Sequence, residues 1–221
     1  MRVSKWVVVA VLSLGVAGVA VAEEEEGPRQ ACVEIPCFDT SGRVKEFAPT
    51  WKEGVDIQEK LIQMELDVNS IEPDLKTAMG VAEDAPLEKA IADLKESAGD
   101  KLIVSLESGG MPSFAVADDA PENVKTFADA GNAAAAKLQK ISADAQSLEG
   151  DITKLGTEAS DASGKMNAGT MKANGLKVSD LKGELDIVKH NKEAAKGLKD
   201  RSAKVVAEST RLSGMLASMA N

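Results

Sequence analysis

The sequence has no tyrosine, one histidine and two cysteines, and its aromatic residues, four Phe and two Trp, make up 3% of the chain. A β-sandwich or β-barrel needs many short strands rich in aromatic and β-branched residues, so this composition argues against both classes. With 43% apolar residues the chain is also too hydrophobic for an intrinsically disordered protein. The composition therefore predicts an all-α protein.

Groups suited to catalysis are equally scarce. His190 stands between Lys189 and Asn191, and the sequence places no serine or cysteine beside it, so we expect an exposed surface histidine. The sequence has no phosphate-binding glycine loop, nucleophile elbow or two-histidine helix motif. We predict a protein that is not an enzyme and that needs no cofactor or metal.

The first 22 residues are typical of a secretory signal peptide. Arg2 and Lys5 form a basic start, residues 6–19 are mainly apolar, and residues 20–22 (Ala-Val-Ala) have the small-x-small pattern of a cleavage site. An uncleaved membrane anchor is the alternative, because residues 6–22 just reach the length of a membrane span. Cleavage after residue 22 predicts an exported protein, periplasmic or extracellular.

Export would place both cysteines in an oxidising compartment. Cys32 and Cys37 are five residues apart, with Pro36 between them to bend the chain, which predicts a local disulfide. A redox pair favours two intervening residues, and a zinc site would need more ligands than the remaining His190 offers. We interpret residues 23–49, which begin with four glutamates, as an acidic and partly disordered leader that contains this Cys loop.

Charge divides the mature chain into two unlike halves. Residues 23–120, the acidic N-terminal half, hold 9 basic and 23 acidic side chains, whereas residues 121–221 hold 15 basic and 13 acidic ones. This overall acidity makes nucleic acid an unsuitable partner.

Residues 50–111 are predicted to form two main helices. Thr50 and Glu53 provide a capping box for the first helix, which has apolar residues at intervals of three and four and ends before Pro73, giving residues 51–71. The second helix is expected over residues 86–107, although residues 102–106 would also suit a short buried strand.

Residues 112–120 are expected to be a linker, followed by a coiled-coil helical hairpin over residues 121–221. Apolar and small residues alternate at intervals of three and four without a slip from Val124 to Leu176, which is heptad periodicity. The pair Asn174-Gly175 then predicts the turn of the hairpin.

The returning helix is predicted over residues 179–219. Its apolar residues fall in two registers displaced by one residue near Ala195, which implies local overwinding. We expect the two arms to extend beyond the rest of the fold. Because the seam is rich in Ala and Gly, we expect the hairpin alone to be marginally stable and to need self-association or a partner.

The last predicted helix also carries a basic stripe. Its members follow at steps of seven, three, four and three residues: Lys182, Lys189, Lys192, Lys196 and Lys199. An anionic lipid or cell-wall polymer could bind there; the alternatives are a solvated face and pairing with the acidic N-terminal half. Our interpretation is a structural or protein-interaction component of the cell envelope, with a membrane-surface-binding helical protein as the alternative.

Overall fold

The computed structural model describes residues 36–107 and 110–220. The predicted signal peptide, the four glutamates of the leader and Cys32 lie outside these residues. Cleavage of the signal peptide and the pairing of Cys32 with Cys37 therefore stay predictions.

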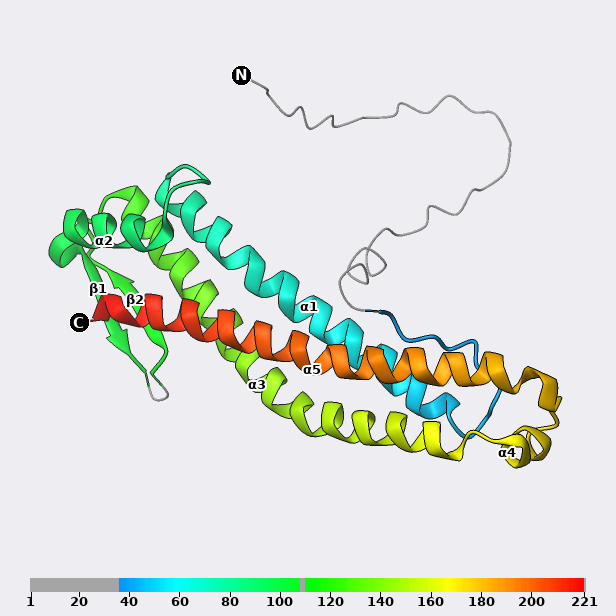
Figure 1. Ribbon diagram of the computed structural model, residues 1–221. Helices are drawn as coiled ribbons and strands as arrows, with labels where there is room; N and C mark the ends of the chain where they lie inside the picture. The colour runs from blue at the N-terminus through cyan, green and yellow to red at the C-terminus, as the bar shows by residue number, and fades with distance from the viewer. Residues whose placement is uncertain (1–35, 108–109, 221) are drawn as a thin grey trace, which may run out of the picture.

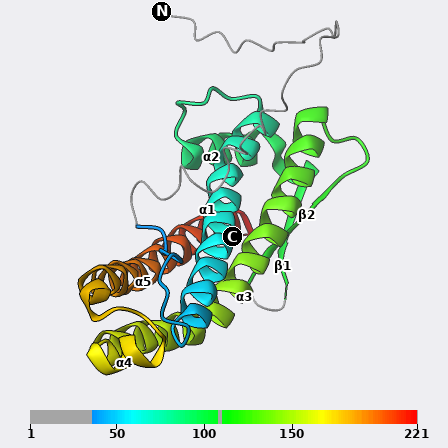
Figure 2. The same cartoon turned by 90° about the vertical axis from the view of Figure 1, so that its right-hand side faces the viewer.

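Three long helices run side by side: α1 (Ala48–Met79), α3 (Glu122–Lys165) and α5 (Leu181–Ala217) (Figure 1). Helices account for 77% of the described residues, which confirms the all-α class, and α3 and α5 are the antiparallel arms of the predicted hairpin. The arms do not protrude, because α1 packs along both of them (Figure 2). No helix of the described residues has the length and hydropathy that a membrane span requires.

The α3 seam is confirmed along the whole helix. Every predicted seam position in α3 is buried: Val124, Phe127, Gly131, Ala134, Leu138, Ile141, Ala145, Leu148, Ile152, Leu155, Ala159 and Ala162. The predicted continuation of the seam as one helix to Leu176 is wrong, because α3 ends at Lys165. Asn167 then caps a separate short helix, α4 (Ala168–Ala173). The Asn167 side chain accepts hydrogen bonds from the backbone N–H groups of the first turn of α4, and this competes with one continuous helix.

The seam of α5 has one register, so the overwinding expected near Ala195 is wrong. Two polar residues hold core positions that a search for apolar residues misses: Glu184, 3% exposed, and Asn191, which is fully buried, whereas Lys192 is exposed. With these two included, the seam alternates steps of four and three: Glu184, Val188, Asn191, Ala195, Leu198, Ser202, Val205, Ser209, Leu212, Leu216 and Met219.

Both predicted ends of the first helix are wrong. The helix begins before Thr50, whose hydroxyl donates to Glu158 Oε2 of α3 at 2.9 Å instead of capping its own helix. At the other end the helix continues through Pro73 to Met79. A proline removes one helical hydrogen bond, but Leu75 and Met79 continue the buried stripe beyond it, and their burial favours the extra turns.

The chain between α1 and α3 folds over the end of the bundle that holds the C-terminus (Figure 1). Helix α2 (Leu87–Ala98) and a short 3₁₀ turn, η2 (Gly99–Lys101), lead into an antiparallel hairpin of β1 (Leu102–Leu106) and β2 (Pro112–Val116). The expected helix over 86–107 is therefore too long. The strand alternative is correct for β1, although only Leu102 of this strand is buried, and most of the expected linker is β2.

Strand β2 is fixed to α3 by two neighbouring residues. The Asn132 side chain accepts a hydrogen bond from the Phe114 N–H (2.9 Å) and donates one to the Phe114 carbonyl (2.8 Å). Gly131 leaves room for the Phe114 ring, because a Cβ there would lie 2.9 Å from Cδ2 of that ring. The outer edge of β2 is thereby satisfied by a side chain of α3.

Candidate protein-interaction surface

The N-terminal segment, residues 36–47, lies along α5 and uses the polar seam residues as its anchors (Figure 1). Asn191 accepts a hydrogen bond from the Asp39 N–H (2.6 Å) and donates one to the Asp39 carbonyl (2.8 Å). Glu184 accepts from the backbone N–H of Arg43 (3.0 Å) and from its Nε (2.8 Å). These residues of the expected leader are therefore ordered in the structure.

His190 takes part in the same contact. It is exposed, as the sequence predicts, and its Nε2 lies 2.7 Å from the carbonyl oxygen of Cys37, to which it donates in the matching tautomer. The pKa of Asp39 is lowered, chiefly by the hydrogen bonds that its carboxylate accepts from Ser41. The polar residues 184, 190 and 191 thus hold an extended backbone segment.

Electrostatic pairing between the two halves of the chain depends on residues outside the basic stripe. Arg201 of α5, whose side chain is 7% exposed, donates from Nε to Glu65 Oε2 of α1 at 2.6 Å. Lys154 of α3 lies 3.1 Å from Glu53 of α1, and the pKa of Lys154 is raised chiefly by that hydrogen bond.

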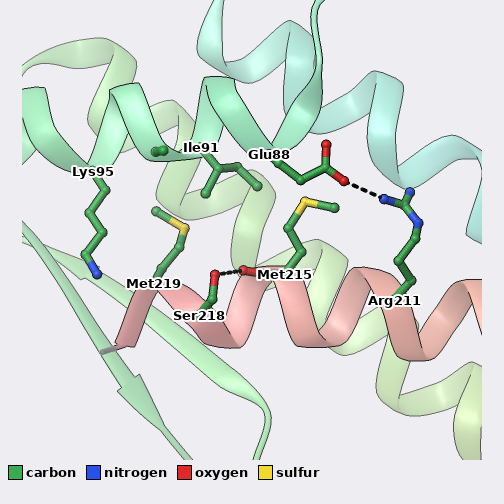
Figure 3. A pocket seen from close by; sticks show the side chains of 8 residues that line it. Glu88, Ile91, Lys95, Arg211, Met215, Ser218 and Met219 are labelled. Carbon is green, nitrogen blue, oxygen red and sulfur yellow. Dashed lines mark hydrogen bonds and ion pairs between the residues drawn. The ribbon is translucent and has the colours of Figure 1, made fainter.

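Arg211 makes the densest of these contacts, at the end of α5 (Figure 3). Its guanidinium lies 3.0 Å from Glu88 of α2, 3.1 Å from Glu72 of α1 and 2.7 Å from Glu208 on its own helix. The pKa of Arg211 is raised, first by the hydrogen bond to Glu208. The pKa of Glu72 is lowered, mainly by its hydrogen bond with Lys76.

Beside Arg211, a shallow hollow of about 530 Å³ separates α2 from the end of α5 (Figure 3). Ile91, Met215 and Met219 form its apolar lining, and the ion pair of Arg211 with Glu88 stands at one side. Met219 is 3% exposed and belongs to the core, which agrees with a packing role for this methionine.

The basic stripe lies on the exposed side of α5. All five of its lysines are exposed, and only Lys189 has an ion-pair partner among the described residues, Asp186 at 3.9 Å. The other four have no carboxylate of the described chain within 4.0 Å. Glu53, Glu65 and Glu72 of α1 pair with Lys154, Arg201 and Arg211, and no stripe lysine pairs with an acidic residue of that helix.

A groove between α3 and α5 runs beside the stripe. Two hollows of about 360 and 560 Å³ share Ile152, Thr153 and Lys199, so they form one continuous depression, which we call the α3–α5 groove. It opens away from α1, since the residues that pair with α1, such as Lys154 and Arg201, do not line it.

Small residues form much of the groove lining. They come from both helices: Ser142, Ala145, Gly156 and Ser160 from α3, and Ala195, Ser202 and Ala203 from α5. Val206, 44% exposed, adds an apolar side chain. The charged lining is mixed: Lys192, Lys196, Lys199 and Glu193 stand on the α5 side, and Glu149 and Asp161 on the α3 side. A Cβ built on Gly156 would meet no atom within 4 Å, so packing within the chain does not require glycine there.

Three of the five stripe lysines predicted from sequence therefore meet a groove, which the lysine spacing alone did not indicate. Comparisons with protein-family models, curated proteins and solved structures gave no match.

Proposed function

We propose that this protein is an exported, non-enzymatic interaction protein of the cell envelope, and that it binds a helix of a partner protein along the α3–α5 groove. The observation that carries the proposal is the set Lys192, Lys196 and Lys199 on the α5 side of that groove, which pairs with no carboxylate among the described residues. Lys154, Arg201 and Arg211 are already engaged by carboxylates of α1, whereas these three lysines line a groove that another molecule can enter.

The shape of the groove favours a helix as the bound element. Two long antiparallel helices form its walls, and small side chains such as Gly156 and Ala203 allow a third backbone to come close, at the interaxial distances of about 8–10 Å usual for packed helices. Carboxylates on the bound helix would face the three lysines. Apolar side chains would cover Ile152 and Val206.

Export supports the envelope location and rests on the sequence of residues 1–22. Outside the cytosol the Cys32–Cys37 disulfide would form and limit the movement of the chain ahead of Cys37. Mass spectrometry of the protein recovered from its own compartment tests both points. A chain that retains Met1 contradicts cleavage, and two free thiols contradict the disulfide.

Crosslinking in the intact envelope tests the groove. The variant Lys192→Glu/Lys196→Glu/Lys199→Glu is expected to lose the protein partner captured by the wild type. The matched control, Lys52→Glu/Lys89→Glu/Lys172→Glu, makes the same change of charge at exposed lysines outside the groove and should keep that partner. Equal capture by both variants would refute the groove as the binding surface.

Flotation with anionic liposomes separates a protein partner from a membrane surface. If the wild type floats with the liposomes and the groove variant does not, the lysines bind lipid headgroups, and the alternative function replaces the proposed one. We expect no flotation, because no aromatic residue follows Phe127 to anchor the helices at a lipid interface.

A further inference from the structure

Strand β1 has one paired edge and one open edge. The Ala117 N–H donates to the Lys101 carbonyl (3.0 Å) and the Glu107 N–H to the Met111 carbonyl (2.8 Å), so the odd-numbered residues of this strand direct their backbone groups toward β2. In an antiparallel pair the direction alternates, and Leu102, Val104 and Leu106 therefore direct theirs to the other side.

The open edge has no side-chain cover like that of β2, and the other element packed near β1 is the C-terminal turn η4 (Ser218–Ala220). The outer side of Phe114 in β2 is bonded to Asn132, and β2 begins with Pro112, which has no N–H to leave unpaired. In the part of the chain that the structure describes, no third strand pairs with β1, and no side chain bonds to its outer backbone groups in the way that Asn132 bonds to Phe114.

The side chains of β1 also lack the features that usually protect an edge. Its sequence, Leu-Ile-Val-Ser-Leu, contains no charge, proline or glycine, and Ile103 and Leu106 are 55% and 49% exposed. Natural proteins normally blunt such an edge with lysine, proline or a bulge, because an open apolar edge is a template for another strand. An additional strand is therefore the element that fits here.

We propose that β1 pairs with β1 of a second copy of this chain, antiparallel about a two-fold axis at Val104, so that two hairpins form one four-stranded sheet. In this register every outward N–H and C=O of Leu102, Val104 and Leu106 bonds to the other copy. The strand also places Leu106 beside Leu102 of the other copy, which covers an exposed apolar side chain.

Charge complementarity identifies a second copy as the occupant. The two-fold at Val104 sets Lys101 of each protomer opposite Glu107 of the other, so unlike charges flank the strand pair at both ends. Within its own chain Lys101 pairs with Asp119 at 2.5 Å and is still 35% exposed, so it remains available to a second carboxylate. A parallel arrangement would set Lys101 against Lys101, which is unfavourable.

Sedimentation velocity of residues 23–221 over a wide range of concentrations tests this pairing. The wild type is expected to shift from monomer to dimer. Val104→Pro removes an N–H that points away from β2, so it spares the hairpin and deletes one intermolecular hydrogen bond per protomer. We expect dimerisation to weaken about 10- to 30-fold with an unchanged circular dichroism spectrum.

Charge exchange provides a second variant that does not alter the backbone. Glu107→Lys sets like charges opposite each other and should weaken the dimer, and the double variant Lys101→Glu/Glu107→Lys should restore it. Glu96→Lys, at an exposed position of α2, is the matched control and should dimerise as the wild type does. A monomeric wild type, or a dimer that Val104→Pro and Glu107→Lys leave intact, would overturn the proposal.

Discussion

Replacing Asn191 with alanine tests how strongly the N-terminal segment is held on α5. The side chain is fully buried and forms two hydrogen bonds with the backbone of Asp39, at 2.6 and 2.8 Å. Alanine removes both bonds and keeps the helix. The half-buried Asp39 can then bind water, so the penalty for its freed backbone groups stays small.

The expected effect follows from the typical net value of such bonds. Two neutral hydrogen bonds contribute about 1–3 kcal/mol together, and the higher helix propensity of alanine returns about 0.5 kcal/mol. We therefore expect the free energy of unfolding to fall by about 1.5 kcal/mol. For a chain of this size that corresponds to a decrease in Tm of about 3–6 °C.

Thermal unfolding followed by circular dichroism measures the change. The matched control is Asn69→Ala, because Asn69 is exposed on α1 and gains the same helix propensity without losing a hydrogen bond of the described structure. Limited proteolysis adds a local measurement, since cleavage within residues 36–47 should become faster in Asn191→Ala alone. Equal Tm values for the two variants would refute the assigned role of the Asn191 amide.

Three further substitutions test packing and electrostatics. Gly131→Ala should destabilise the fold by about 1–2 kcal/mol in chemical denaturation, because its Cβ would lie 2.9 Å from Phe114; Gly150→Ala, with open space around it, should stabilise by up to about 1 kcal/mol. The pKa of Glu72 is lowered, mainly by its hydrogen bond with Lys76, so the ionised carboxylate stabilises the fold at pH values above the ordinary pKa of 4.5. This stabilisation is lost as the pH falls below that value and the carboxylate is protonated. Glu72→Gln should therefore flatten the loss of stability measured below about pH 4.5, and an unchanged slope would contradict the pairing.

The heptad seam of α3 was predictable because each of its buried positions carries an apolar or small residue, so the period is visible in the sequence. The same rule failed on α5. There, Glu184 and Asn191 occupy seam positions, and the apolar residues before Ala195 suggest a displaced register that the helix does not have, whereas the register predicted from Ala195 to Met219 is confirmed.

Single residues that usually start or end helices predicted the helix ends less reliably than the apolar periodicity predicted the helices. Pro73 was expected to end the first helix, but burial of Leu75 and Met79 continues it. Asn167, which does not interrupt the periodic pattern, begins a new helix through its side-chain cap. A capping residue or a proline indicates the free-energy effect of that one residue on a helix. The observed helix ends also depend on which side chains the rest of the fold buries.

The candidate surface could be predicted only in part, for a similar reason. The spacing of Lys192, Lys196 and Lys199 places them on one face of a helix, and the structure adds that α3 residues form a groove beside that face. Sequence alone left open whether the stripe pairs with the acidic N-terminal half. Within the described residues, Arg201 and Arg211 pair with Glu65 and Glu72 of α1, and no stripe lysine pairs with that helix.

The polar seam residues and the N-terminal segment explain each other. Helix α1 begins at Ala48, so its apolar face does not extend over the first turns of α5, and the extended residues 36–47 lie there instead. An extended backbone brings N–H and C=O groups that need partners where it is buried. Asn191 and Glu184 supply them. The same solution recurs at Asn132, which bonds the outer edge of β2, so polar residues at these two places mark where a helix of the bundle meets extended chain instead of another helix.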